Sequence, residues 1–320
     1  MAMQSVTFRD KSGKFVSKPY VLNPTDPTQV FAKHSSETSF ARIEGASRKN
    51  FLDHNKDSFA VFTSEELVVV AICDGSMNRG AYFSSTLASL LIKHTLEHEG
   101  DPPTLSVLPA IAQRAINNLF DLENVSGKKG DALSTMTLVT LFPDGTYHAI
   151  AVGDSPLFRF SDGDNERHFD YKNVLIRSSD GSNLIKVRAR SLPLEAYEAS
   201  FRNTAYVGYD VEGGVVSFDF EYGMGKLKSG SKLLLATDGL TKLGIHEISL
   251  AGPLPLIKTN DQILNWGSIV STYSDPSSSL EHLFAIVNQR SYKSSSLHLA
   301  KTQHCFRVHD DVTCVLIEKK

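Results

Sequence analysis

Short apolar segments of strand length recur along this chain, and they constrain its fold more than any other feature. Most are rich in β-branched residues and bounded by Gly, Asp or Pro, which favours strands over pieces of helix. They are Ser58–Phe62, Leu67–Cys73, Met136–Phe142, Tyr147–Val152, Leu157–Phe160, Leu233–Thr237 and Val312–Ile317, with a further short strand expected near Ser39–Ile43. Pro143-Asp144-Gly145 joins two of these segments with turn residues, so those two strands are expected to be antiparallel.

Four other segments carry apolar residues at the three- and four-residue spacing of amphipathic helices. They are Ala81–His98, Leu105–Leu122, Gln262–Tyr273 and Ser279–Gln289. Two helices therefore follow the first strands, and two more precede the last strand. This order predicts an α+β fold in which helices pack against antiparallel sheets. We expect an N-terminal extension over residues 1–40 and one domain over residues 41–320, with a flap or surface hairpins within residues 161–231.

The composition narrows the possible classes of function. The chain of 320 residues has 33 Lys and Arg against 36 Asp and Glu, so it lacks the excess of basic residues typical of nucleic-acid-binding proteins. No apolar segment approaches the roughly 20 residues needed to span a bilayer, and the first residues lack the apolar core of a signal peptide. Cys73 and Cys314 lie in apolar runs, which is typical of buried free thiols. We therefore expect a cytoplasmic protein without a nucleic-acid or membrane partner.

Acidic residues stand where several of the predicted strands begin or end. Asp57 and Asp310 precede strands, whereas Asp74 and Asp238 each follow a strand and are themselves followed by Gly. One such acid is commonly a turn residue, but carboxylates of neighbouring strands would converge at one edge of a sandwich and repel one another. Divalent cations relieve this repulsion, and oxygen ligands with few histidines suit Mg²⁺ or Mn²⁺ better than Zn²⁺.

Two such metals offer a route to phosphate hydrolysis. Metal ions about 4 Å apart can share a bridging water, lower its pKa and hold a phosphate in line for attack. Gly75 has no side chain, so its backbone carbonyl can turn toward a metal. The sequence contains no P-loop, no kinase Gly-rich motif and no G-x-S-x-G elbow. Metal-assisted hydrolysis without a protein nucleophile is consistent with these observations.

The motifs around these acids resemble, in order, those of the PPM/PP2C metal-dependent Ser/Thr phosphatases, in a divergent form closest to bacterial branches. The resemblance begins at about Ala41. Asn55-Lys56-Asp57-Ser58 resembles the early Asn-Glu-Asp motif, CDGSM the metal-bridging Asp-Gly segment, LSTMTLV the Gly-Thr-Thr strand, GDS the Gly-Asp-Ser turn, ATDGL the later Asp-Gly and DDVT the terminal Asp-Asn-Val-Thr.

The resemblance implies a four-layer α-β-β-α sandwich with two central antiparallel sheets and a binuclear Mn²⁺ or Mg²⁺ centre at one edge. It implies that Asp74 bridges both metals and that Gly75 lends its carbonyl to one of them. Asp238 and Asp310 would bind the other metal, with Asp57 supporting the site directly or through water.

Other positions add to this implied site or depart from it. Asp131 matches a family ligand of a weaker third metal, and Asp154 matches a structural turn residue outside the metal shell. Lys56 replaces an acid or amide, and Pro156 replaces an Arg. Ser76 stands where some members carry a His proposed as general acid, and the sequence leaves open whether it contacts the substrate.

The phosphate-binding Arg of the family is missing, because Leu52 occupies its position. Arg48 and Arg42 lie nearby in the sequence, and a guanidinium group suits phosphate because it can donate two parallel hydrogen bonds. Either residue could therefore take the place of the missing Arg. The sequence also leaves open whether Arg79, after the first Asp-Gly, helps to hold a substrate.

The sequence thus predicts a phosphoserine/phosphothreonine protein phosphatase, a monomeric hydrolase of a signalling system that acts opposite a cognate Ser/Thr kinase. Asp57, Asp74, Asp238 and Asp310 would assemble two metals, and Asp131 would add a third. Two alternatives stay open at this point. The chain could be a pseudophosphatase that serves as a regulatory binding module, or a phosphatase of a small phosphorylated molecule.

Overall fold

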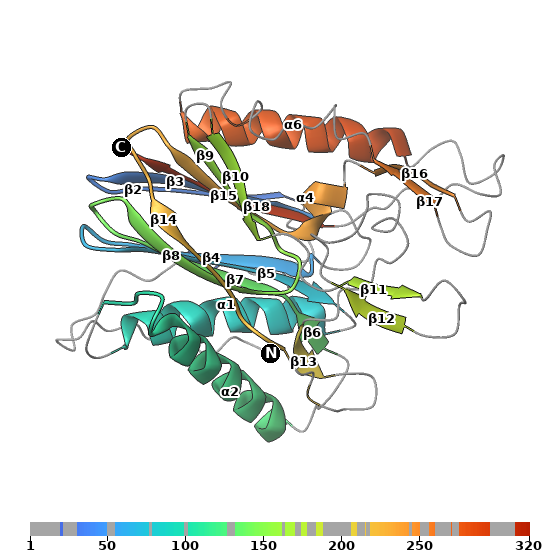
Figure 1. Cartoon of the computed structure of the whole chain (residues 1–320), viewed down its shortest axis with the longest axis horizontal. Helices are drawn as coiled ribbons and strands as arrows, with labels where there is room; N and C mark the ends of the chain where they lie inside the picture. The colour runs from blue at the N-terminus through green and yellow to red at the C-terminus, as the bar shows by residue number, and fades with distance from the viewer. Residues whose placement is uncertain are drawn as a thin grey trace.

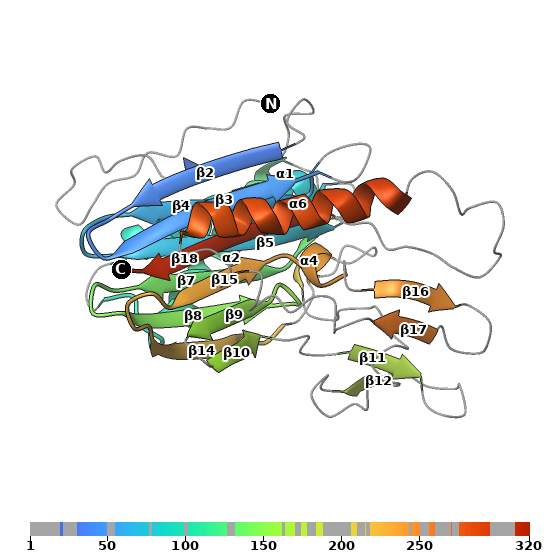
Figure 2. The same cartoon turned by 90° about the horizontal axis from the view of Figure 1, so that it is seen from above.

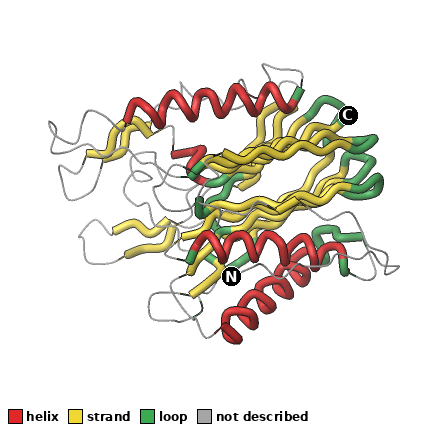
Figure 3. The backbone as a smooth tube through the Cα atoms, turned by 180° about the vertical axis from the view of Figure 1, so that it is seen from behind, coloured by secondary structure: helices red, strands yellow, loops and turns green. Residues whose placement is uncertain are grey.

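The computed structural model of the chain describes residues 20–21, 31–49, 55–76, 79–98, 102–126, 132–161, 164–169, 174–177, 184–187, 206–209, 215, 218–242, 245–249, 256–259, 270, 275–294 and 311–320. Two β-sheets lie face to face at its centre. Helices α1 (Gly80–Leu96) and α2 (Leu108–Ser126) cover the outside of one sheet, and α6 (Pro276–Ser294) covers the outside of the other (Figure 1, Figure 3). The predicted four-layer α-β-β-α sandwich is confirmed.

The sheet beneath α1 and α2 has eight strands in the order β1-β4-β5-β7-β8-β14, with β6 paired to β5 and β13 paired to β6. All of its pairings are antiparallel. Its strands are β1 (Tyr20–Val21), β4 (Asp57–Thr63), β5 (Val68–Ser76), β6 (Ala132–Ser134), β7 (Met136–Leu141), β8 (Thr146–Val152), β13 (Val207–Tyr209) and β14 (Glu221–Lys226).

The sheet beneath α6 has six strands in the order β10-β9-β15-β18-β3-β2, and it is antiparallel as well. Its strands are β2 (Phe31–Glu37), β3 (Ala41–Arg48), β9 (Leu157–Ser161), β10 (Asp164–Phe169), β15 (Lys232–Ala236) and β18 (Val312–Lys319). A short helix, α4 (Asp238–Lys242), begins one residue after β15.

Two hairpins lie outside the sheets. One consists of β11 (Val174–Arg177) and β12 (Leu184–Val187), and the other of β16 (Ile245–Ser249) and β17 (Leu256–Thr259). Both project beyond the end of the sandwich at which α4 lies (Figure 1, Figure 2).

The central strands are buried on both faces, which explains why the sequence shows continuous apolar runs rather than an alternating pattern. In β5, alternate residues pack in different layers. Val69, Ala71 and Cys73 belong to the core shared with α1 and α2, whereas Val68, Val70 and Ile72 belong to the core between the sheets. Strands β15 and β18 divide their residues in the same way between the core shared by the sheets and the core beneath α6.

The structure differs from the sequence prediction at two places that bear on the site. Strand β5 does not stop before Asp74 but continues through Gly75 and Ser76, because these two residues pair with β6. The segment predicted as an N-terminal extension contributes β1 to one sheet and β2 to the other. The position of a domain boundary stays a prediction.

The predicted helices Ala81–His98, Leu105–Leu122 and Ser279–Gln289 correspond to α1, α2 and α6. The predicted helix Gln262–Tyr273 lies, apart from Val270, outside the described residues. None of the helices in the described part of the chain is long and apolar enough to cross a membrane.

A glycine sets how closely the two sheets can approach. Gly45 of β3 faces Phe59 of β4 across the core between the sheets, and a Cβ atom added at Gly45 would lie 2.5 Å from Cε2 of Phe59. Phe59 is fully buried, so its ring has little room to move aside. The absence of a side chain at Gly45 is therefore what lets this aromatic ring fill the layer.

We predict that Gly45→Ala lowers the free energy of unfolding by about 1–3 kcal/mol, because it overpacks the core. The same change should cost less in a Phe59→Leu background, where the clashing ring atoms are gone. Urea denaturation of the four proteins of this double-mutant cycle measures both values. An equal cost in the two backgrounds would show that the contact with Phe59 does not limit the approach of the sheets.

Candidate metal centre

Two of the predicted metal ligands lie opposite each other on neighbouring strands. Asp57, the first residue of β4, is paired directly with Asp74 of β5. Directly opposed residues of antiparallel strands have Cα atoms about 4.5–5.5 Å apart and project to the same face of the sheet. Strand alternation gives Asp57 the face of Phe59 and gives Asp74 the face of Ile72, and both of these apolar residues lie in the core between the sheets. The two carboxylates therefore project into the end of that layer.

The second sheet brings Asp238 to the same place. Asp238 is separated from the end of β15 by Thr237 and is the first residue of α4, and its carboxylate atom Oδ1 is buried. The preceding residue, Thr237, donates a hydrogen bond of 2.7 Å from Oγ1 to Oδ2 of Asp57. Because consecutive Cα atoms are about 3.8 Å apart, this bond holds Asp238 beside Asp57.

The last acidic motif is described only in part. Asp310 lies outside the described residues, as does Asp131, so their assignments as ligands stay predictions. Asp311 is buried, and its Oδ2 accepts a hydrogen bond of 2.9 Å from the backbone amide of Lys56. This contact sets the start of β18 beside the start of β4. In the part of the chain that the structure describes, no three His, Cys, Asp or Glu side chains are gathered as a metal-binding group.

The described donor groups fit a hard divalent cation. Asp57 is 1% exposed and Asp238 is 5% exposed, so the site concentrates carboxylate oxygens away from water. Burial, together with the negative charges of Asp74 and Asp57, raises the pKa of the Cys73 thiol, and burial and Asp57 also raise the pKa of Cys314. Both thiols are therefore protonated at neutral pH and are poor metal ligands. Oxygen ligands without thiolates match Mg²⁺ or Mn²⁺.

Gly75 is required for a steric reason that the sequence did not reveal. A Cβ atom added there would lie 2.2 Å from the carbonyl oxygen of Gly80 and 2.5 Å from that of Lys56. A Cβ atom at Gly80 would in turn lie 2.7 Å from the carbonyl carbon of Gly75. The first turn of α1 thus packs backbone against backbone on β5, directly after Asp74. The carbonyl of Gly75 as a metal ligand stays a prediction.

Arg79, whose role the sequence left open, is held by the neighbouring helix. Its guanidinium group makes a two-bond ion pair with the carboxylate of Glu123 on α2, with Nη2 and Oε1 2.9 Å apart and a second contact from Nη1 to Oε2. The Glu123 side chain is completely buried. The structure therefore supports a role for Arg79 in joining α1 to α2. Ser76 is half-buried at the end of β5.

The two candidate phosphate-binding arginines lie at opposite ends of one strand. Arg48, the last residue of β3, is paired with Val312, next to Asp311. It is half-buried, burial lowers its pKa, and its Nε is buried without a hydrogen-bond partner among the described residues. Arg42 lies about 20 Å away along β3, is exposed, and contacts Glu37 at 3.2 Å. The structure brings Arg48 to the end that holds the acids and does not bring Arg42 there. Leu52 lies outside the described residues.

Asp154 lies where the chain crosses from one sheet to the other. It stands in the short connection between β8 of the eight-stranded sheet and β9 of the six-stranded sheet. In the same connection, the hydroxyl of Ser155 is 2.7 Å from Oγ1 of Thr135, and the carbonyl of Pro156 accepts a hydrogen bond of 3.1 Å from the amide of Ala236. This position agrees with the predicted role of a turn residue.

Sequence reasoning missed the hydroxyl residues that hold the acids. Thr135 receives a hydrogen bond of 3.1 Å from the Asp74 amide on its side chain and donates one of 2.9 Å from its own amide to the Asp74 carbonyl. Thr237 donates a hydrogen bond to Asp57 from the second sheet, and the amide of Thr313 donates one to the Thr237 hydroxyl. All three threonines stand within the motifs that were recognised, but only the structure shows that Thr135 contacts Asp74 and that Thr237 contacts Asp57.

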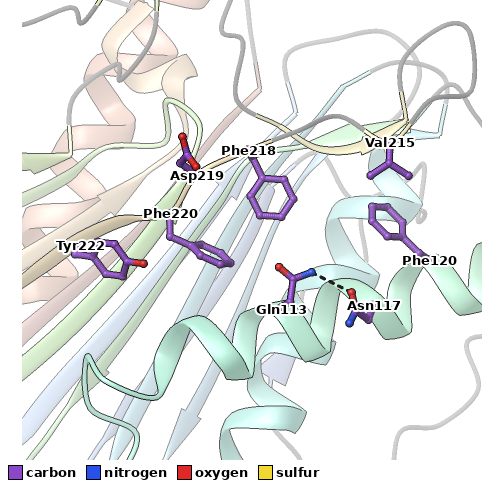
Figure 4. A pocket seen from close by; sticks show the side chains of 8 residues that line it. All are labelled: Gln113, Asn117, Phe120, Val215, Phe218, Asp219, Phe220 and Tyr222. Carbon is purple, nitrogen blue, oxygen red and sulfur yellow. Dashed lines mark hydrogen bonds between the residues drawn. The ribbon is translucent and has the colours of Figure 1, made fainter.

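A groove of ≈ 650 Å³ lies elsewhere, between α2 and the residues that lead into β14 (Figure 4). It is lined by Gln113, Asn117, Phe120, Val215, Phe218, Asp219, Phe220 and Tyr222. Phe218 and Phe220 pack against the core shared by α1, α2 and the eight-stranded sheet. None of the candidate acids lines this groove, so it is separate from the candidate metal centre.

No family model matches the chain, and no curated protein matches it. Solved structures do match its fold. The PPM Ser-Thr phosphatase MsPP from Mycobacterium smegmatis is 20% identical over 91% of this chain and 98% of its own, with a TM-score of 0.53. The catalytic domain of the phosphatase PstP, with two manganese ions, is 16% identical over 88% and 98%, with a TM-score of 0.54. RsbX, in complex with magnesium, is 12% identical over 90% and 100%, with a TM-score of 0.51. The chain therefore has the PPM phosphatase fold.

We predict that Gly80→Ala destabilises the protein, although Ala is favoured over Gly inside a helix by about 0.8–1.0 kcal/mol. The added Cβ would push the first turn of α1 away from Gly75. Urea denaturation should show a lower unfolding midpoint, whereas the control Lys93→Ala, at a half-exposed position of the same helix, should change it little. A Gly80→Ala protein as stable as the unmodified one would contradict the close backbone packing.

Proposed function

We propose that this protein is a metal-dependent phosphatase of phosphoserine and phosphothreonine residues in proteins. The observation that carries the proposal is the direct pairing of Asp57 with Asp74, together with the hydrogen bond by which Thr237, the residue before Asp238, is held against Asp57. Carboxylates that are buried close together repel one another, and divalent cations relieve this repulsion. The PPM fold adds support, since known proteins of this fold include Ser/Thr phosphatases.

In this proposal the ligands of two Mn²⁺ or Mg²⁺ ions are Asp57, Asp74, Asp238 and Asp310, with the carbonyl of Gly75. Asp131 would be a ligand of a third, weaker site. When bound, the ions supply an activated water and neutralise charge that develops on the phosphate. The PstP structure with two manganese ions and the RsbX structure with magnesium support this choice of metals.

The chain's own residues would position the reactants. Asp57 and Asp74 stand on neighbouring strands that are packed on both faces, so their separation would be fixed before substrate arrives. The Arg48 guanidinium would donate hydrogen bonds to the phosphate oxygens. No side chain is proposed as a nucleophile, so the phosphate would pass directly to water with inversion at phosphorus.

The proposed substrate is a phosphorylated protein, and the proposed setting is a cytoplasmic signalling pathway in which a Ser/Thr kinase acts in the opposite direction. The hairpin β11–β12, which belongs to the predicted flap of residues 161–231, projects beyond the end of the sandwich at which α4 and Asp238 lie (Figure 2). A surface at that position would be suited to contact a protein substrate. We propose that the enzyme works as a monomer.

We predict that Asp74→Asn and Asp238→Asn each abolish Mn²⁺-dependent hydrolysis of p-nitrophenyl phosphate and of a phosphothreonine peptide, because each removes a charged metal ligand. EDTA should abolish the activity of the unmodified protein in the same assay. Near-normal turnover in both variants would contradict the metal assignment. Two outcomes would favour the alternatives: no Mn²⁺ binding at millimolar metal points to a pseudophosphatase, and a strong preference for phosphometabolites points to a small-molecule phosphatase.

Arg48 and Arg42 provide a matched pair of variants, because both are arginines and both lie on strand β3. We predict that Arg48→Ala raises KM for the phosphopeptide by about 10–100-fold, because a charge-assisted hydrogen bond contributes about 1.5–3 kcal/mol. Arg42→Ala should leave KM within about twofold, because its exposed ion pair contributes little. Steady-state kinetics with both variants make the comparison, and equal effects of the two changes would remove Arg48 from the proposed site.

A further inference from the structure

Five buried residues at the candidate metal centre form a closed ring of hydrogen bonds that joins the two sheets. The amide of Asp57 donates to Oδ1 of Asn55 at 3.0 Å, and Nδ2 of Asn55 donates to Oγ of Ser47 at 2.7 Å. Oγ of Ser47 lies 2.5 Å from Oγ1 of Thr313. The amide of Thr313 donates to Oγ1 of Thr237 at 3.0 Å, and that hydroxyl donates to Oδ2 of Asp57 at 2.7 Å. Each member is at most 5% exposed.

The partners of the Thr237 hydroxyl determine which of its hydrogen bonds it donates and which it accepts. Its oxygen accepts from the backbone amide of Thr313, which can only donate. Its single hydroxyl proton then has two candidate acceptors, Oδ2 of Asp57 at 2.7 Å and the carbonyl of Thr313 at 3.5 Å. The carboxylate is both nearer and the stronger acceptor, so the proton is donated to Asp57.

Thr237 also links acids from different sheets. Its side chain contacts Asp57 of the eight-stranded sheet, and its own carbonyl carbon is bonded to the amide nitrogen of Asp238. One hydrogen bond and one peptide unit thus set the separation of two proposed metal ligands. Thr237 is fully buried, so water does not compete for this hydrogen bond.

We propose that Thr237 is a positioning residue that holds the Asp57 carboxylate in one orientation and thereby raises the affinity of the centre for its metal. This inference rests on the proposed function, because it concerns the same metal site. Groups that hydrogen-bond to metal-ligating carboxylates orient those ligands, and their removal commonly lowers metal affinity or activity by about 10–100-fold. Thr237 itself touches neither metal nor phosphate in this scheme.

The test is calorimetric titration of Mn²⁺ into metal-free protein, which does not depend on activity. Thr237→Val removes the hydroxyl and keeps nearly the same shape, and we expect its dissociation constant for Mn²⁺ to rise about 10–100-fold. Thr237→Ser keeps the hydroxyl and should bind Mn²⁺ within about threefold of the unmodified protein. The matched control is Thr140→Val, which removes another fully buried threonine hydroxyl, one that donates to the carbonyl of Pro103 at 2.9 Å. That variant should bind Mn²⁺ normally.

The outcomes separate this inference from the proposed function. If the unmodified protein binds no Mn²⁺, both fail. If it binds Mn²⁺ and Thr237→Val binds equally well, the inference alone is overturned, and the same holds if Thr237→Ser is weakened as much as Thr237→Val. If Thr237→Val does not fold, as judged by circular dichroism in EDTA, Thr237→Cys replaces it. A thiol is a weak donor, so weaker Mn²⁺ binding by Thr237→Cys supports the inference and unchanged binding overturns it.

Discussion

Burial of the central strands on both faces is the constraint on which the rest of this structure depends. Strand β5 lies between two helices and a second sheet, so apolar neighbours surround almost its whole length. A charge inside such a strand would be strongly destabilising without a partner, which confines carboxylates to strand ends. Asp57 begins β4 and is paired by the antiparallel register with Asp74, two residues before the end of β5. Asp238 begins α4, just after β15, and the hydrogen bond from Thr237 holds it beside Asp57. The reactive end of the molecule is thus a consequence of how its core is layered.

The same constraint decides how much of the fold could be predicted from the sequence. Strands that are buried on both faces, such as β5 and β15, appear as apolar runs, and the helices that cover the sheets show helical spacing. The edge strands gave no comparable signal. Strand β2 has the sequence FAKHSSE and β14 has EYGMGK, and both have few apolar residues and many exposed positions. They are strands because a neighbouring strand pairs with them, and a local pattern does not contain that information.

The candidate site, like the fold, could be predicted from the sequence only in part. The acids could be found because each stands at a strand end within a recognisable motif. The contacts that orient them could not, since Thr237 and Asp57 are 180 residues apart. Arg48 and Arg42 were equally plausible in the sequence, and only the direction and register of β3 distinguish them. The chain matches known PPM structures at only 12–20% identity. The layers of a fold and the positions of its strand ends can therefore stay alike while most side chains differ.

The place of β18 in its sheet has a consequence for folding. This strand is inserted between β15 and β3, and Ser47 of β3 contacts Thr313 of β18 across a sequence separation of 266 residues. Contacts over such separations form slowly, because a long loop must close before they contribute. Until β18 is inserted, β3 and β15 each present an unpaired edge that other chains can join. Any folding intermediate in which β18 is not yet inserted should therefore be prone to aggregation, and it should lack the ring around Asp57.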